Sequence, residues 1–230
     1  MSPGSRIMAV EIEILKSISY FSGLSTEDLD SITKFISEKT TERGEIILLE
    51  GEPSRELYFI VYGAVKLFKT SAEGKEQILS IVRQWESFGD VPMFDGGPNP
   101  ASAQTMVPTG LYGLKKSALE AILREHSQIA HNIISVLAGQ VRHSMSLVED
   151  LSFKHVIDRV AKILLEYAGD GTGSRPRLTQ QEMAAMAGTA REMIGRSLKS
   201  LEEDGVIKLD RHRIVVTNSE ALKELAGAGI

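Results

Sequence analysis

The sequence contains no cysteine among its 230 residues. Iron–sulfur clusters held by thiolates, Cys-based zinc sites, disulfides and thiol redox switches are therefore excluded. The sequence also lacks an apolar run long enough to span a membrane and a secretory signal pattern, so we expect a cytoplasmic protein without a membrane partner. Met1–Ile7 is expected to be a mobile leader or an expression scar, with Met8 as a candidate natural start.

Signatures of catalysis are missing as well. The sequence has no phosphate-binding loop, no nucleophile–base constellation and no metal-ligand cluster, which predicts that the protein is not an enzyme. Its hydrophobic content of 42% and charged content of 25% are ordinary for a globular chain of one or two domains. Of its 26 basic and 31 acidic residues, 12 and 11 lie from Lys154 onward, so the net charge is +1 there and −6 before it. The acidic excess therefore belongs to the first part of the chain.

The segment Leu178–Leu201 has the pattern of two short helices joined by a glycine turn. Thr179 and Glu182 have the spacing of a capping box at the start of the first helix. Gly188 allows a left-handed turn, after which Thr189 is expected to cap the second helix. The apolar residues of the second helix are expected to face inward; they are Met193, Ile194, Leu198 and Leu201.

The outward face of that second helix carries Arg191, Glu192 and Arg196. A guanidinium can span O6 and N7 of guanine, and a carboxylate can accept from N4 of cytosine. A helical hairpin with a solvated charged face is the alternative. The residues that follow favour DNA binding, because Val206–Leu209 and Ile214–Val216 flank a charged turn and predict a β-hairpin. Together these elements predict a winged helix.

Short β-type runs punctuated by glycines occupy the first half of the chain and predict an all-β roll. They are preceded by two expected helices, Val10–Tyr20 and Thr26–Lys39, the second with a Ser25 or Thr26 cap. The expected strands are Ile46–Leu49, Leu57–Val61, Ala64–Phe68, Gln77–Val82 and Gly110–Leu114.

A long helix is expected between Ser117 and Leu151, which contains no proline. Apolar and polar residues recur there in steps of four and three, which predicts a coiled-coil seam between two copies of the chain. A helix that packs on its own roll gives a similar stripe, so this alternative stays open. The residues of this stripe are Ile129, Ile133, Val136, Gln140, His143 and Leu147.

As a whole, the chain resembles the cyclic-AMP receptor protein / FNR family of bacterial transcription regulators, over about Ile14–Leu222. The motifs occur in the family's order and are Gly44-Glu45-Ile46, Glu50-Gly51-Glu52, Leu57–Gly63, Phe88-Gly89-Asp90, Val160–Leu165 and Thr179–Leu201. The resemblance implies an α+β protein with a β-roll effector-sensing domain (residues 1–116), a dimerisation helix and hinge (117–153, with Leu151–Lys154 as the hinge) and a winged-helix DNA-binding domain (154–230).

The resemblance also implies roles and partners. Members of the family are dimers, so a homodimer on double-stranded DNA is implied. Arg191, Glu192 and Arg196 match the family's base-contacting positions, which implies TGTGA-like half-sites in an inverted repeat. RNA polymerase is the further partner if the protein is an activator. The candidates for phosphate contact are Thr179, Gln181, Thr189, Arg211 and His212.

In cyclic-nucleotide-binding members of the family, an arginine binds the phosphate and an acid binds the ribose. The matching cassette here begins at Gly89-Asp90, and Pro100 stands at the arginine position with Ala101 beside it. Proline has neither charge nor N–H, so we expect a small effector other than cyclic AMP. On the long helix, Ser144 is aligned with a residue that meets the ligand, and Met145 is its neighbour.

The chemistry of the effector stays open. Trp85, Phe88, Met93, Phe94 and Met106 lie near the cassette, either around an apolar ligand such as an organic anion or metabolite or simply as roll core. Haem for sensing of CO or NO is an alternative, with His126, His131 and His143 as candidate axial ligands. A cyclic-nucleotide-binding-like sensor subunit without DNA activity is a further alternative.

Overall fold

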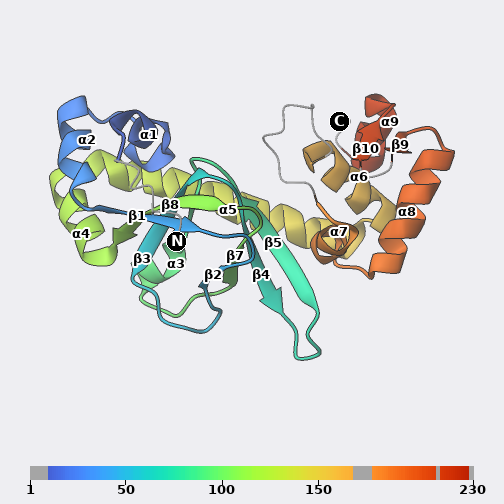
Figure 1. The fold of residues 1–230 in the computed structure, drawn as a ribbon, viewed down its shortest axis with the longest axis horizontal. Helices are drawn as coiled ribbons and strands as arrows, with labels where there is room; N and C mark the ends of the chain where they lie inside the picture. The colour runs from blue at the N-terminus through green and yellow to red at the C-terminus, as the bar shows by residue number, and fades with distance from the viewer. Residues whose placement is uncertain (1–9, 168–177, 211–212, 228–230) are drawn as a thin grey trace, which may run out of the picture. The chain divides into compact units, whose positions relative to one another are not determined.

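The computed structural model describes residues 10–167, 178–210 and 213–227 of the chain. The chain divides into two compact units, residues 1–69 with 80–143 and residues 70–79 with 144–230 (Figure 1). The expected leader Met1–Ile7 lies outside the described residues. Within the described ranges, every helix is too short or too polar to serve as a membrane span.

Short helical elements begin the first unit: α1 (Ile12–Ser17), the 3-10 turn η1 (Ser19–Phe21) and α2 (Thr26–Thr33). The Ser25 cap is confirmed, because its side chain accepts from the Asp28 N–H in a complete capping box. The prediction that α2 continues to Lys39 is wrong. The chain turns into strand β1 (Ile36–Thr41), whose pairing with β8 satisfies its backbone and overrides the helical spacing.

Two four-stranded sheets form the predicted roll (Figure 1). The first has the order β1-β8-β3-β6 and adds β8 (Thr109–Lys115), β3 (Glu56–Tyr62) and β6 (Ser87–Phe88) to β1. The second has the order β2-β7-β4-β5, with β2 (Ile46–Leu48), β7 (Ser102–Thr105), β4 (Val65–Thr70) and β5 (Glu76–Val82). The five predicted strands are confirmed, whereas β1, β6 and β7 were not predicted.

The long helix of the prediction is two helices, α4 (Lys116–Glu125) and α5 (Ser127–Phe153). The chain leaves the helical conformation between them at His126, with φ −127° and ψ 78°. The predicted stripe on α5 is turned toward the chain's own first unit: Ile129 and Ile133 are buried in its core, and Val136 packs against that core. The alternative of a helix on its own roll therefore holds for these residues. The short helix α3 (Asp90–Asp95) follows β6.

The second unit contains the predicted winged helix. The helices α6 (Val156–Tyr167), α7 (Gln180–Ala187), α8 (Arg191–Glu203) and α9 (Ser219–Ala226) share one apolar core with the hairpin of β9 (Ile207–Asp210) and β10 (Arg213–Val216). Helix α5 ends within the expected hinge Leu151–Lys154. Helix α9 was not predicted.

Candidate DNA interface and effector site

Helix α7 begins at a complete capping box. The Thr179 hydroxyl accepts from the Glu182 N–H at 3.1 Å, and the Glu182 carboxylate accepts from the Thr179 N–H at 2.6 Å. Gly188 ends the helix with φ 62°, a conformation that favours glycine. The box and the glycine set where α7 starts and stops, as the sequence predicts. They thereby fix where the chain turns into α8.

Helix α8 presents the three predicted base-contacting residues to solvent, since Arg191, Glu192 and Arg196 are all exposed. The opposite face is anchored in the core of the second unit by Ile194, Leu198 and Leu201. Two predictions about this helix are wrong. Met193 is 37% exposed rather than buried. The N-cap is Ala190 rather than Thr189, because the first helical hydrogen bonds run from the N–H groups of Met193 and Ile194 to the Ala190 carbonyl.

The candidate phosphate contacts lie in different settings. Thr179 and Gln181 are exposed at the start of α7, and Thr189 is half-buried between α7 and α8. The capped Thr179 hydroxyl still carries a proton that can be donated to a phosphate oxygen. The wing candidates Arg211 and His212 lie outside the described residues, between the paired strands β9 and β10.

The predicted effector cassette begins at Gly89, whose φ of 84° is left-handed. A Cβ atom there would lie 2.9 Å from the Glu56 carbonyl oxygen, so only glycine fits. Pro100 is exposed, and its carbonyl accepts from Nζ of Lys69 at 3.1 Å, while Ala101 beside it is half-buried. Ser144 and Met145 are both exposed on α5.

Asp90 follows Gly89 and is only 4% exposed. Its Oδ1 accepts from the Tyr20 hydroxyl and from Oγ of Ser87 (3.0 Å), and its Oδ2 accepts from Nε2 of Gln140 (3.3 Å). Sequence reasoning missed this network. Tyr20 and Gln140 are 70 and 50 residues away in the chain, so no local pattern announces their contact with Asp90.

The apolar residues near the cassette belong mainly to the core. Phe88, Met93 and Met106 are buried, and Phe88 stacks on Tyr58 with ring centroids 5.3 Å apart. Trp85 is half-buried against the core of the first unit, and Phe94 is 43% exposed. These positions favour the interpretation of Phe88 and Met93 as roll core over that of ligand contacts.

The three candidate haem ligands stand in different surroundings. Nδ1 of His126 lies 3.7 Å from Oδ1 of Asp28, so its ring faces α2. His131 and His143 are exposed on α5. Among the described residues, no group of three or more histidine, aspartate or glutamate side chains is arranged to hold a metal ion.

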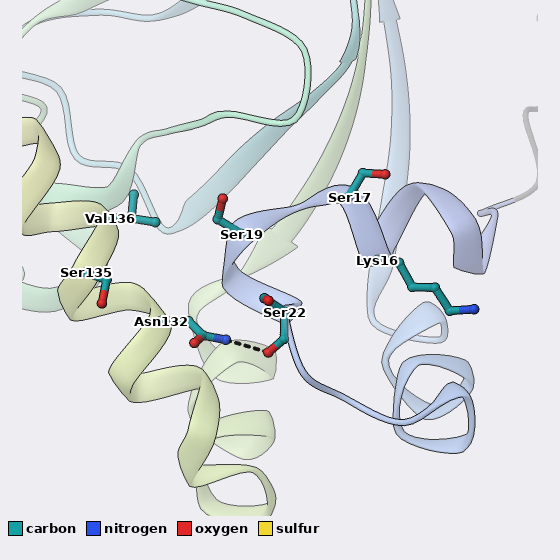
Figure 2. A pocket seen from close by; sticks show the side chains of 7 residues that line it. All are labelled: Lys16, Ser17, Ser19, Ser22, Asn132, Ser135 and Val136. Atoms are coloured by element: carbon teal, nitrogen blue, oxygen red, sulfur yellow. Dashed lines mark hydrogen bonds between the residues drawn. The ribbon is translucent and has the colours of Figure 1, made fainter.

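A groove of about 470 Å³ lies between the N-terminal segment and α5 (Figure 2). Nδ2 of Asn132 donates across it to the Ser22 carbonyl at 2.8 Å. The groove contains none of the predicted effector residues. It is lined by Lys16, Ser17, Ser19, Ser22, Asn132, Ser135 and Val136.

Comparison with known proteins agrees with this architecture. Residues 38–126 match the model of the cyclic nucleotide-binding domain, and residues 158–225 match that of the Crp-like helix-turn-helix domain. A protein named cyclic AMP receptor protein from Thermus thermophilus is 32% identical over 92% of this chain and 98% of its own length. A CRP-like cAMP-activated global transcriptional regulator from Mycobacterium tuberculosis is 31% identical over 93% and 99%.

Among solved structures, FixK2 from Bradyrhizobium japonicum has a TM-score of 0.74 and 27% identity, covering 83% of this chain and 96% of its own. The fold and the helix-turn-helix thus define a DNA-binding transcription regulator. The chain belongs to the cyclic-AMP receptor protein / FNR (Crp/Fnr) family.

Proposed function

We propose that the protein is a homodimeric regulator that binds an inverted repeat with its two α8 helices and responds to a small effector other than cyclic AMP. The observation that carries this proposal is the joint exposure of Arg191, Glu192 and Arg196 on the solvent face of α8. The three functional parts are residues 1–116 for sensing, 117–153 for dimerisation and 154–230 for DNA binding. Since its ligand is DNA, we assign the protein to the cytoplasm.

Arg191 and Arg196 donate to guanine edges in this proposal, and Glu192 accepts from cytosine. Both bases occur in a TGTGA-like half-site and its complement. Thr179, Gln181 and Thr189 contact phosphates and set the register of α8 in the groove. Buried Ile194, Leu198 and Leu201 support this arrangement, because they hold α8 by its opposite face. RNA polymerase is the further partner if the bound form activates transcription.

An exposed apolar stripe on α5 supports the dimer. Ile134, Val141 and Val148 are spaced by seven residues and are 63%, 56% and 64% exposed, and Met145 between the last two is 69% exposed. A heptad of this kind buries itself against a second parallel copy in a coiled coil. We propose this stripe as the dimer seam, in place of the one around Ile133 that is already buried within the chain.

The effector is expected to lack a phosphate monoanion. The family relatives are named for cyclic AMP, but this chain has Pro100 at the position where the resemblance places the phosphate-binding arginine. Loss of a charge-assisted bidentate contact weakens a phosphate ligand strongly. An organic anion or another metabolite fits better, and its binding would alter the pairing of α5 and, through the hinge Leu151–Lys154, the separation of the two α8 helices.

A gel shift at two salt concentrations tests the DNA half of the proposal, with an inverted TGTGA repeat and a random duplex of equal length. We expect tight binding to the repeat alone, with an affinity that falls as salt rises. Equal affinity for both duplexes would refute sequence-specific regulation.

Calorimetry with cyclic AMP tests the effector half of the proposal, since tight binding by the unaltered protein would refute it. Absorbance near the Soret band and mass spectrometry of the purified protein identify haem or another co-purifying ligand.

A further inference from the structure

The Asp90 carboxylate joins three separate segments of the first unit. Its donors are Tyr20 from η1, Ser87 from β6 and Gln140 from α5. A buried carboxylate is stable only when hydrogen bonds replace the water it has lost. Because Asp90 is only 4% exposed, its oxygens face the protein rather than an open site.

Tyr20 is held rigidly beside this carboxylate. Its side chain is 1% exposed, and its ring meets the Phe59 ring edge-on at 5.3 Å. Its carbonyl accepts from Nδ2 of Asn132 at 3.0 Å, and the same amide group holds the Ser22 carbonyl (Figure 2). Burial, reinforced by the Asp90 carboxylate, raises the pKa of the Tyr20 phenol, so the hydroxyl remains a donor at neutral pH.

The carboxylate cannot easily turn to meet another partner. Gly89 precedes it in a left-handed conformation and lies so close to the Glu56 carbonyl that no side chain fits. Two donors already share Oδ1, and the Gln140 amide lies on Oδ2. Three of its about four acceptor sites are thus occupied, and the group is only 4% exposed, so a ligand hydroxyl could reach it only by displacing an internal donor or by opening the packing around it.

We propose that Tyr20 is a specificity-determining residue of the sensing domain: by occupying Asp90 it withholds that carboxylate from ligand hydroxyls, so that ribose-bearing effectors gain no contact there. This inference rests on the proposed function, in which the effector is not cyclic AMP, and adds an exclusion that is independent of Pro100. Asp90 thus stands at the acid position of the cassette, but its carboxylate binds side chains of the protein itself.

The experiment compares cyclic AMP with its 2′-deoxy analogue, which lacks the hydroxyl that a free carboxylate would bind. Binding of both is measured by calorimetry for the unaltered protein, Pro100→Arg and Tyr20→Phe/Pro100→Arg. Pro100→Arg is expected to bind the two nucleotides equally within about twofold. The double variant should prefer cyclic AMP by about tenfold, which corresponds to about 1.4 kcal/mol. Tyr58→Phe/Pro100→Arg is the matched control, because it removes a tyrosine hydroxyl bound to Glu56 and should show no preference.

A preference for cyclic AMP in Pro100→Arg would overturn the inference, since it means that Asp90 is available while Tyr20 is intact. This arm decides the question even if the double variant does not fold. A folded double variant that binds neither nucleotide, or both equally, also contradicts it. Tight cyclic AMP binding by the unaltered protein would instead refute the proposed effector class, and equal affinity for the 2′-deoxy analogue would then still support the role of Tyr20.

Discussion

Nζ of Lys154 lies 3.0 Å from Oδ1 of Asp150, one helical turn earlier in the chain, where α5 ends. Lys154 also donates to the Ala226 carbonyl at the end of α9 at 2.8 Å. Lys162 of α6 hydrogen-bonds to Oδ2 of Asp150. This one carboxylate, only 8% exposed, therefore joins the last turns of α5 to two helices of the winged-helix unit.

We expect Asp150→Asn to lower the free energy of unfolding by about 1–3 kcal/mol, because it leaves partly buried ammonium groups without a charged acceptor. Thermal and denaturant unfolding measure the loss. Glu149→Gln is the matched control, since Glu149 is the exposed neighbour on the same helix and its neutralisation should change little. Equal losses for the two variants would contradict the role of Asp150.

The contribution of Asp150 should also depend on pH. Burial raises the pKa of this carboxyl, but hydrogen bonds from Lys162 and Lys154 outweigh burial, and the pKa lies below its ordinary value. A depressed pKa stabilises the folded state above the unfolded value of about 3.9 and loses that effect as pH falls through the folded pKa. The difference in stability between wild type and Asp150→Asn should thus be full near pH 6 and shrink below about pH 4. A difference that grows on acidification would contradict the assignment.

Arg191→Ala should cost about 1–3 kcal/mol of binding to the cognate repeat and relax one base position in each half-site. Gel shifts against single-base variants of the repeat measure both effects. Lys223→Ala serves as the control, because it removes an exposed cation from α9 in the same unit. A footprint and base preference unchanged by Arg191→Ala would refute the assignment.

Gln181→Ala should behave differently from Arg191→Ala. A phosphate contact carries no base information, so its loss should weaken binding to all duplexes alike and reduce the salt slope by about one. Affinities on cognate and random DNA, each at several salt concentrations, test this. A loss confined to the cognate sequence would instead make Gln181 a base contact.

Gly195→Ala should separate stability from function. Gly195 lies inside α8, and a Cβ there would meet no atom within 4 Å. Alanine should raise the free energy of unfolding by about 0.5–1 kcal/mol. It should also weaken DNA binding by about tenfold, or about 1.4 kcal/mol, because a methyl group would project from the helix that carries Arg191 and Arg196.

Gly139→Ala in α5 is the control. A Cβ there also meets no atom within 4 Å, so this variant should stabilise the protein without weakening DNA binding. Unchanged DNA affinity in Gly195→Ala would contradict the prediction that DNA approaches the α8 backbone closely at Gly195.

Val141→Lys should convert the proposed dimer to monomers, because it places a charge in the apolar stripe of α5. Sedimentation velocity measures the mass directly. Leu49→Lys is the control, since Leu49 is similarly exposed on the roll, at 46% against 56% for Val141. A dimer that survives Val141→Lys with unchanged affinity would place the interface elsewhere.

Local chemistry determined the parts of the candidate DNA interface that the sequence predicts. Thr179 and Glu182, which form the capping box, are three residues apart in the chain. Gly188 ends α7 because glycine readily adopts a left-handed conformation. Both features therefore depend only on residues within one or two helical turns. The exposure of Arg191 and Arg196 follows from the helical period set by Ile194, Leu198 and Leu201. The order of the predicted domains follows from the order in which the family's motifs occur along the chain.

Only the tertiary structure decided which face of α5 is buried and what Asp90 binds. The stripe around Ile133 and the stripe around Val141 both have helical spacing, and the choice between them depends on the roll against which α5 packs. Ser87 is a sequence neighbour of Asp90, but its other two partners, Tyr20 and Gln140, are 70 and 50 residues away and are brought to it by the fold. Such contacts depend on the completed core rather than on any local preference, because no hydrogen bond to a neighbour in sequence specifies them.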